Sequence, residues 1–141
     1  MKKYFTIIIL MGLAMWASLS LAGFVPAEGI VEHRGAFTVG RLLIAGSIEN
    51  SEPVGIVNAF ASSTEKVYCF LEARDIKEAS TVGFVWYHGD TEVAKVPLQL
   101  KQGQRWRTWS SKRLGGRTGK WRVELQDAEG KVLATVEFLV E

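Results

Sequence analysis

The segment from Gln104 to Leu114, QRWRTWSSKRL, gathers the residue types best suited to holding a ligand. It contains two tryptophans, three hydroxyl side chains and four cations, with no acid among them. Guanidinium groups present planar donor pairs to a carboxylate or phosphate, and a flat indole face stacks on a sugar ring or an apolar group. We therefore predict a ligand-binding surface in this segment. Its candidate residues are Arg105, Arg107, Trp109, Ser111, Lys112 and Arg113.

An extended strand over this segment decides which side chains share a surface. Side chains alternate between the two faces of a strand, so Arg105, Arg107, Trp109 and Ser111 fall on one face. Trp106 then points to the core, because burying unpaired guanidinium groups is very costly. Two alternatives stay open. A β-bulge near Thr108 would turn both rings inward, and an arginine stacked on Trp109 would form an internal cation–π pair.

Charge is unevenly distributed along the chain. Nine cations and no acid lie between Glu92 and Glu124. From 23 to 94 there are ten acids against five cations, and from 124 to 141 five acids against one cation. The net charge is +2, which gives no overall basic excess for nucleic-acid binding. Either the basic segment forms a binding surface, or neighbouring strands neutralise it by pairing opposite charges across the solvent face.

The sequence predicts no catalytic residues, metal site or cofactor. His33, His88 and Cys69 are scattered, whereas a zinc site needs three or four closely spaced ligands. The stretch RLGGRTGK lacks the spacing and the strand-to-helix context of a phosphate-binding loop. Cys69 lies in an apolar run and is expected to act as a small buried hydrophobe. We therefore expect a protein that is not an enzyme.

The elements that position the candidate surface are predicted to be strands. Hydrophobic periodicity is close to two from residue 36 onward, and short turns interrupt it. Runs 67–73 and 82–88 are apolar on both faces, as in central strands. Pro97 marks the strand 91–100 as an edge strand, because proline donates no ladder hydrogen bond. Residues 88–90 and 127–130 are typical of hairpin turns.

Near the C-terminus, alternation predicts which side chains point inward. Trp121, Val123 and Leu125 are expected to face the core from one strand. The next strand is predicted to bury the apolar residues Val132, Ala134, Val136, Phe138 and Val140. About seven such strands without a long helix indicate an all-β protein, an antiparallel β-sandwich of immunoglobulin-like topology.

The first residues have a different character. Residues 1–22 begin with Lys2 and Lys3, continue through an uncharged apolar run and end in small residues, which indicates a signal peptide with an N-terminal helix. A retained inner-membrane anchor is the alternative, because the apolar run approaches the length of a bilayer span. Residues 23–35 are expected to be a lead-in, and 36–141 a single β-sandwich domain. We predict export, with the periplasm as the location, and membrane contact only through 1–22 if they are not cleaved.

The chain resembles a bacterial domain-of-unknown-function family, DUF2914, in the runs FVWYH, EVAKVPL, RWRTWSSK, GKWRVE and DAEGKVLA. The resemblance extends from about Leu42 to Glu141, and RWRTWSSK is its most specific part. It implies a bacterial β domain and no assigned activity. The residues that match its signature are Trp86, His88, Arg105, Trp106, Arg107, Trp109, Ser110, Ser111 and Lys112.

Three functional hypotheses follow. The first is a non-catalytic module of the bacterial envelope that binds an anionic glycan, a lipid or an envelope protein, and not nucleic acid. The second is a structural accessory subunit without a small ligand, which docks a partner through a free sheet edge. The third is a small enzyme or metal-binding protein built on His88, Asp90 and Cys69.

Overall fold

The computed structural model describes residues 33–34 and 36–141; the predicted signal peptide and most of the predicted lead-in lie outside them. Every regular element in these described ranges is a β-strand. The strands are β1 (His33–Arg34), β2 (Phe37–Glu49), β3 (Glu52–Ile56), β4 (Ala59–Phe60), β5 (Lys66–Ile76), β6 (Ser80–His88), β7 (Thr91–Leu100), β8 (Gly103–Arg113), β9 (Gly119–Asp127) and β10 (Val132–Val140). None of the described residues belongs to a helix that would reach across a bilayer.

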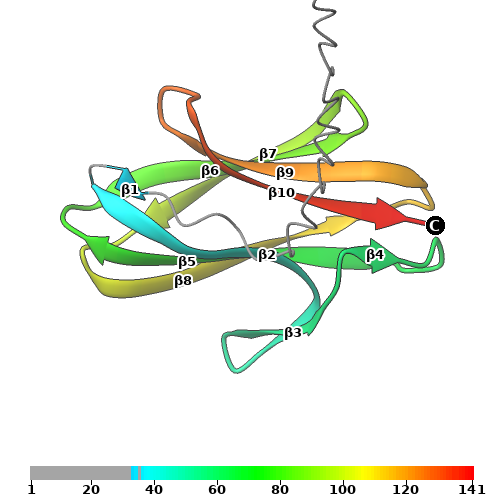
Figure 1. Cartoon of the computed structure of the whole chain (residues 1–141), viewed down its shortest axis with the longest axis horizontal. Coiled ribbons are helices and arrows are strands. Elements are labelled where there is room, and N and C mark those ends of the chain that lie inside the picture. The colour runs from blue at the N-terminus through cyan, green and yellow to red at the C-terminus, as the bar shows by residue number, and fades with distance from the viewer. Residues whose placement is uncertain (1–32, 35) are drawn as a thin grey trace, which may run out of the picture.

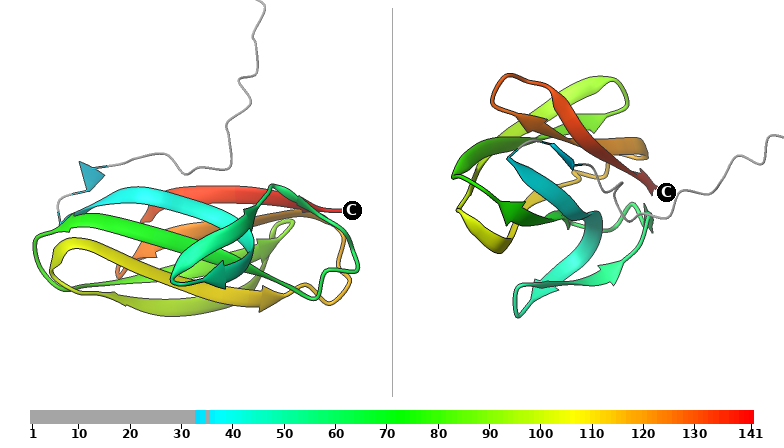
Figure 2. Two further views of the ribbon diagram at one scale, coloured as in Figure 1. Left: turned by 90° about the horizontal axis from the view of Figure 1, so that it is seen from below. Right: turned by 60° about the vertical axis from the view of Figure 1, so that its left-hand side comes forward.

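The strands form two sheets that pack face to face (Figure 1). Sheet A has the order β1-β2-β5-β8, with β3 also paired to β2, and sheet B has the order β4-β10-β9-β6-β7. Pairing is antiparallel except between β4 and β10, which run parallel. The right-hand view in Figure 2 shows the β2–β3 hairpin projecting from sheet A.

The chain order defines an immunoglobulin-like topology. Strands β2, β5 and β8 take the places of strands A, B and E, while β6, β9 and β10 take those of C, F and G. β7 adds to the edge of sheet B beside β6. The predicted all-β, immunoglobulin-like sandwich is therefore confirmed, and its seven long strands are the expected ones. The short strands β1, β3 and β4 were not predicted.

Apolar side chains from the two inner faces fill the space between the sheets. Trp86 and Trp121 are fully buried there, and β5 and β6 are central strands with neighbours on both sides, as their apolar runs predicted. Pro97 lies on β7, which pairs with β6 alone, so its predicted edge position is also confirmed. Trp121, Val123 and Leu125 all point inward as expected.

One inward-facing residue was predicted wrongly. Val132 is exposed, and Leu133 is buried in its place. The cause is an irregularity in the β9–β10 register between Val132 and Ala134. An extra residue on one strand reverses the facing of the side chains before it, so strict alternation holds only from Ala134 onward.

A second bulge, at Gly40, shapes the outer face of sheet A. The β2–β5 register shifts between Val39 and Arg41. Because of this shift, Val39 and Leu42 are both buried in the core while Arg41 points to the outer face. A strand of unbroken alternation would have buried Arg41 instead.

Candidate functional site

The predicted binding strand, β8, lies at the end of sheet A and pairs with β5. The register is continuous from Arg105 opposite Arg74 to Arg113 opposite Lys66, with no bulge at Thr108. Alternation therefore holds as predicted along the strand. Arg105, Arg107 and Trp109 share the outer face, and Trp106 packs against the core from the inner face.

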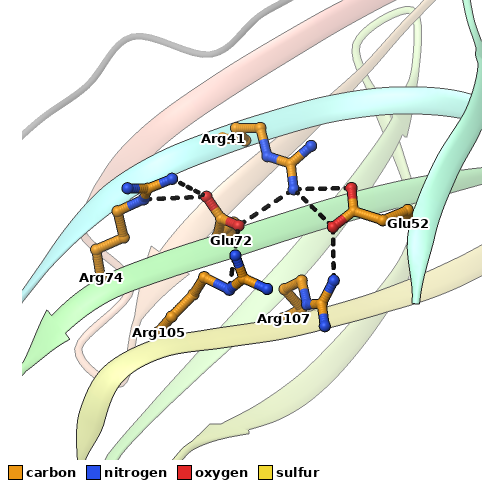
Figure 3. Close-up of polar contacts among 6 residues, drawn as sticks. All are labelled: Arg41, Glu52, Glu72, Arg74, Arg105 and Arg107. Carbon is orange, nitrogen blue, oxygen red and sulfur yellow. Dashed lines mark hydrogen bonds and ion pairs between the residues drawn. The ribbon is translucent and has the colours of Figure 1, made fainter. Parts of the chain in front are cut away.

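Glu72 lies at the centre of the charges on this outer face (Figure 3). Its carboxylate is only 1% exposed, and it accepts hydrogen bonds from Arg74 Nη2 at 2.7 Å and Nε at 3.0 Å. Arg41 Nη2 donates to the other oxygen at 3.1 Å, and Arg105 Nε lies 3.7 Å from that oxygen. Three guanidinium groups therefore converge on one buried carboxylate.

Glu52 brings a second carboxylate to the cluster from the β2–β3 hairpin. It accepts hydrogen bonds from Arg41 Nη2 at 3.0 Å and from Arg107 Nη1 at 2.5 Å. The hairpin tip thus reaches over the outer face to β8. The turn has left-handed backbone at Asn50 and Ser51, and Gly55 opposite Gly46 also has positive φ. Unlike Glu72, Glu52 remains substantially exposed, with 43% of its side chain open to solvent.

Arginine contacts govern the protonation of both carboxylates. Burial alone would raise the pKa of Glu72, but the hydrogen bonds from Arg74 and Arg41 outweigh burial and lower the pKa. The hydrogen bonds from Arg41 and Arg107 likewise lower the pKa of Glu52. Both groups are therefore ionised near neutral pH. Four guanidiniums against two carboxylates leave the cluster (Arg41, Glu52, Glu72, Arg74, Arg105 and Arg107) with an excess of two positive charges.

Trp109 adds an aromatic surface beside these charges. It is the one aromatic among the large hydrophobic side chains that the described residues expose, at 37%. One face of its indole stacks on Phe70, with ring centroids 6.4 Å apart and 11° between the planes. The Arg41 guanidinium lies over Phe70, 5.0 Å from the ring centroid. The exposed part of the Trp109 indole therefore lies beside the arginines, where a ligand can reach it.

A shallow hollow of about 380 Å³ lies where these groups meet. It is lined by Ser51, Arg105, Trp106, Arg107 and Trp109. The hollow thus brings together three of the predicted site residues, Arg105, Arg107 and Trp109. Ser51 of the β2–β3 hairpin also lines it, and alternation along β8 did not indicate this residue. Guanidinium donors beside a flat ring suit an anionic ligand that also has an apolar face.

The last two candidate residues lie differently from the prediction. The sequence SSKRLGGRTGK, residues 110–120, predicts a mobile, cationic, glycine-rich loop after the strand, but β8 continues to Arg113. The alternation places Lys112 on the inner side, opposite buried Val67, and its Nζ lies 3.4 Å from the Arg113 carbonyl. Arg113 stays on the outer side and is 81% exposed, 3.9 Å from Glu65.

The loop after β8 has contacts with the rest of the domain at both of its ends. Leu114 is fully buried, and its amide donates to the Glu65 carbonyl at 2.9 Å. The Trp121 indole donates to the Arg117 carbonyl at 3.1 Å, and the Arg117 guanidinium lies over that ring. A buried leucine and a tryptophan contact therefore anchor the two ends of this loop.

Charge pairing across strands, the alternative reading of the basic segment, holds for part of it. Within the part of the chain that the structure describes, acids lie within 4.0 Å of four of its nine cations: Arg105, Arg107, Arg113 and Arg122. Arg105 and Arg113 nevertheless remain widely exposed, so pairing with these acids leaves both guanidiniums accessible to a ligand.

Sequence reasoning missed Arg41, Glu52, Glu72 and Arg74 as members of the cluster. Glu72 carried the one usable signal, because an acid in a strand that is apolar on both faces requires a cationic partner. The identity of that partner depended on the order of strands in the sheet. Glu52 reaches the cluster through the curvature of the β2–β3 hairpin, whereas the sequence indicated only a turn at this place.

A second hollow, of about 450 Å³, lies on sheet B. Its charged lining is balanced, with Lys120 and Arg122 against Asp90 and Glu137. The Arg122 guanidinium is already stacked on the Tyr87 ring, 3.9 Å from its centroid, and donates to the Gly89 carbonyl. We therefore take the hollow at β8 as the candidate site, since its positive charge is in excess and its tryptophan is partly exposed.

The described residues contain no group of three or more histidine, cysteine or acidic side chains that could hold a metal. Cys69 is buried in the core, and burial raises the pKa of its thiol well above the usual value. His88 Nε2 contacts the Thr118 carbonyl at 2.7 Å, and the ring lies against Trp121. These contacts give His88 and Cys69 structural partners.

The fold and the site define a β-sandwich domain of immunoglobulin-like topology with a basic and aromatic outer face. Residues 79–140 match the model of DUF2914, described as a protein of unknown function, which confirms the resemblance over this part of the chain. The match covers β6 to β10 and includes RWRTWSSK; it does not extend back to Leu42. No curated protein matches the sequence.

Solved structures with a similar fold include an immunoglobulin-like protein from Pseudomonas aeruginosa, at 12% identity and a TM-score of 0.47. That match covers 82% of this chain and 98% of the other. A β-glucosidase from Listeria innocua matches as a D270A mutant with laminaribiose (10% identity, TM-score 0.47) and with glucose (10%, 0.44). These matches cover 81% and 80% of this chain, which spans 16% of the β-glucosidase in each case.

Proposed function

We propose that this domain is a non-catalytic binding module for an anionic, glycan-like component of the bacterial envelope. The observation that carries the proposal is the hollow lined by Arg105, Arg107 and Trp109, where positive charge is in excess and the indole is partly exposed. The guanidiniums would bind a carboxylate, phosphate or sulfate, and the indole would stack on an adjoining ring.

The location in the envelope is a part of this proposal that rests on the sequence of residues 1–22. Their two lysines, apolar run and small terminal residues support export. An exported module meets acidic polysaccharides and lipid headgroups rather than nucleic acid. The binding chemistry is therefore assigned to envelope anions.

Calorimetric titration of the domain with acidic glycans, anionic lipids and peptidoglycan fragments tests the proposal. Arg105→Ala, Arg107→Ala and Trp109→Ala are each expected to weaken binding by about tenfold, the effect of losing one good charged or stacking contact. Lys95→Ala on β7 is the matched control, because it removes an exposed cation from the other sheet. Binding should also weaken with salt. A ligand that is indifferent to all three variants and to salt would place the site elsewhere.

Glu52 offers a second test of the same site. Its carboxylate already bonds Arg107 and Arg41, so an incoming anion competes with it. Glu52→Gln is expected to tighten anion binding severalfold, because the amide competes less well for guanidinium donors. Weaker binding by this variant would show that Glu52 positions Arg107 for the ligand rather than competing with it.

A structural accessory role is the second candidate. β3 pairs with β2 alone in the described sheets, and Val54, Ile56 and Val57 expose apolar side chains on and beside it. A free apolar edge is suited to strand addition by a partner protein. If this role holds, Ile56→Lys should abolish a defined protein complex that Arg105→Ala leaves intact. The reverse pattern would favour the binding module.

A further inference from the structure

The outer face of β5 and β8 carries cations at both of its ends. Arg74 and Arg105 lie opposite each other at one end, and Lys66 and Arg113 at the other. All four are exposed. A ligand that follows β8 would therefore meet positive charge twice, first at Arg105 and again at Arg113.

The middle of this face is aromatic and polar. Trp109 lies opposite Phe70, and Ser111 lies opposite Tyr68, whose ring is half-buried beneath the Lys66 ammonium at 5.4 Å. From Arg107 to Arg113 the strand advances six residues, or about 20 Å at 3.3 Å per residue. The two cationic ends are thus separated by a neutral stretch longer than a single small ligand.

The acids along this face leave the excess of positive charge in place. Glu72 is buried beneath the arginines, and Glu65 lies 3.9 Å from Arg113 in a pair that is largely open to solvent. With Glu52, these three carboxylates face six cations: Lys66, Arg113 and the four arginines of the cluster. Exposed pairs of this kind contribute little, so a ligand anion can replace Glu65 at small cost.

We propose that the ligand is an extended acidic oligosaccharide that lies along β8, with acidic sugars at the Arg105–Arg107 and Arg113 ends and a sugar ring on Trp109. The inference rests on the proposed function and deepens it, because it specifies a polymeric ligand with more than one acid. A lone headgroup or a monosaccharide reaches only one cationic end. An acidic peptide would fill both ends, but the open indole face between them is better suited to the flat face of a sugar ring.

Titration with a length series of uronic-acid oligomers, and a parallel sulfated-glycan series, tests the inference on the full domain. The affinity of long oligomers is expected to exceed that of the monomer by about tenfold or more, because long oligomers add the contacts at Arg113. Arg113→Ala should remove this gain and leave the monomer affinity unchanged. Arg105→Ala should weaken both, and Lys95→Ala neither. Circular dichroism of each variant confirms that the fold is intact.

The outcomes separate the two proposals. If affinity does not rise with length, or if Arg113→Ala leaves the long oligomer unaffected, the extended-ligand inference is wrong and the site at Arg107 and Trp109 still holds. If neither series binds, while anionic lipid vesicles or acidic peptides bind through Arg105 and Arg107, the saccharide assignment is wrong. If no anion binds at all, both proposals fail.

Discussion

Glu72 is the residue on which the arrangement of the outer face depends. Its buried carboxylate holds Arg41 and Arg74 by hydrogen bonds and attracts Arg105 at 3.7 Å. Without it, three like charges would face one another across β2, β5 and β8. The site therefore depends on Glu72, a buried acid that a ligand does not reach. Glu52 is the exposed acid that a ligand does reach.

Removal of this carboxylate should destabilise the fold. Glu72→Gln is expected to lower the free energy of unfolding by about 2 to 3 kcal/mol, because breaking a buried ion pair leaves its partners uncompensated. Urea denaturation followed by tryptophan fluorescence measures the change. Glu65→Gln is the matched control and should shift stability by less than about 0.5 kcal/mol, since its pair with Arg113 is exposed. Equal effects of the two variants would contradict the central role of Glu72.

The same residue makes stability depend on pH. The pKa of Glu72 is lowered in the folded protein from its ordinary value of 4.5, because Arg74 and Arg41 outweigh the effect of burial. An acid whose pKa is lowered by folding contributes its full stabilisation at pH values above its pKa in the unfolded chain. It loses that stabilisation as the pH falls through its pKa in the folded protein. The wild type is therefore expected to lose stability below about pH 4.5 more steeply than Glu72→Gln. Parallel stability curves in acid for the two proteins would refute this linkage.

At the scale of the element, the bulge at Gly40 controls whether Arg41 and Arg74 reach Glu72. A Cβ at Gly40 would lie 2.9 Å from Arg74 Nε and 3.2 Å from the Glu72 carbonyl oxygen. Gly40→Ala is thus expected to displace Arg74 and to cost about 1 to 2 kcal/mol, the loss of a charged hydrogen bond. Thermal denaturation checks this.

Gly46 on the same strand provides the control for that variant. A Cβ there meets the carbonyl oxygens of Gly55 at 3.8 Å and Val54 at 3.9 Å, both ordinary contacts. Gly46→Ala should therefore leave Arg74 in place and change stability by less than Gly40→Ala does. If both variants lose the same stability, the conformational preference of the backbone explains why residue 40 is a glycine, and the close approach of Arg74 does not.

Alternation within a strand made much of this site predictable, and pairing between strands did not. Alternation along β8 is enough to predict that Arg107 and Trp109 face outward and that Trp106 faces inward. Glu72 and Glu52 become partners of these arginines only through sheet order and hairpin curvature, which are long-range properties. The same limit explains Val132, where a bulge in the pairing with β9 overrode the period of the sequence.

At the scale of the whole molecule, Cys69 offers a probe of cooperative unfolding. It lies on the central strand β5, fully buried between the sheets, and burial raises the pKa of its thiol. A thiol reagent attacks the thiolate, so the native protein is expected to resist labelling until the sandwich opens. Labelling measured in increasing urea should then follow the loss of tryptophan fluorescence, with Cys69→Ala as the unlabelled control. Rapid labelling below the unfolding transition would contradict this expectation and show that sheet A separates from sheet B in a local step.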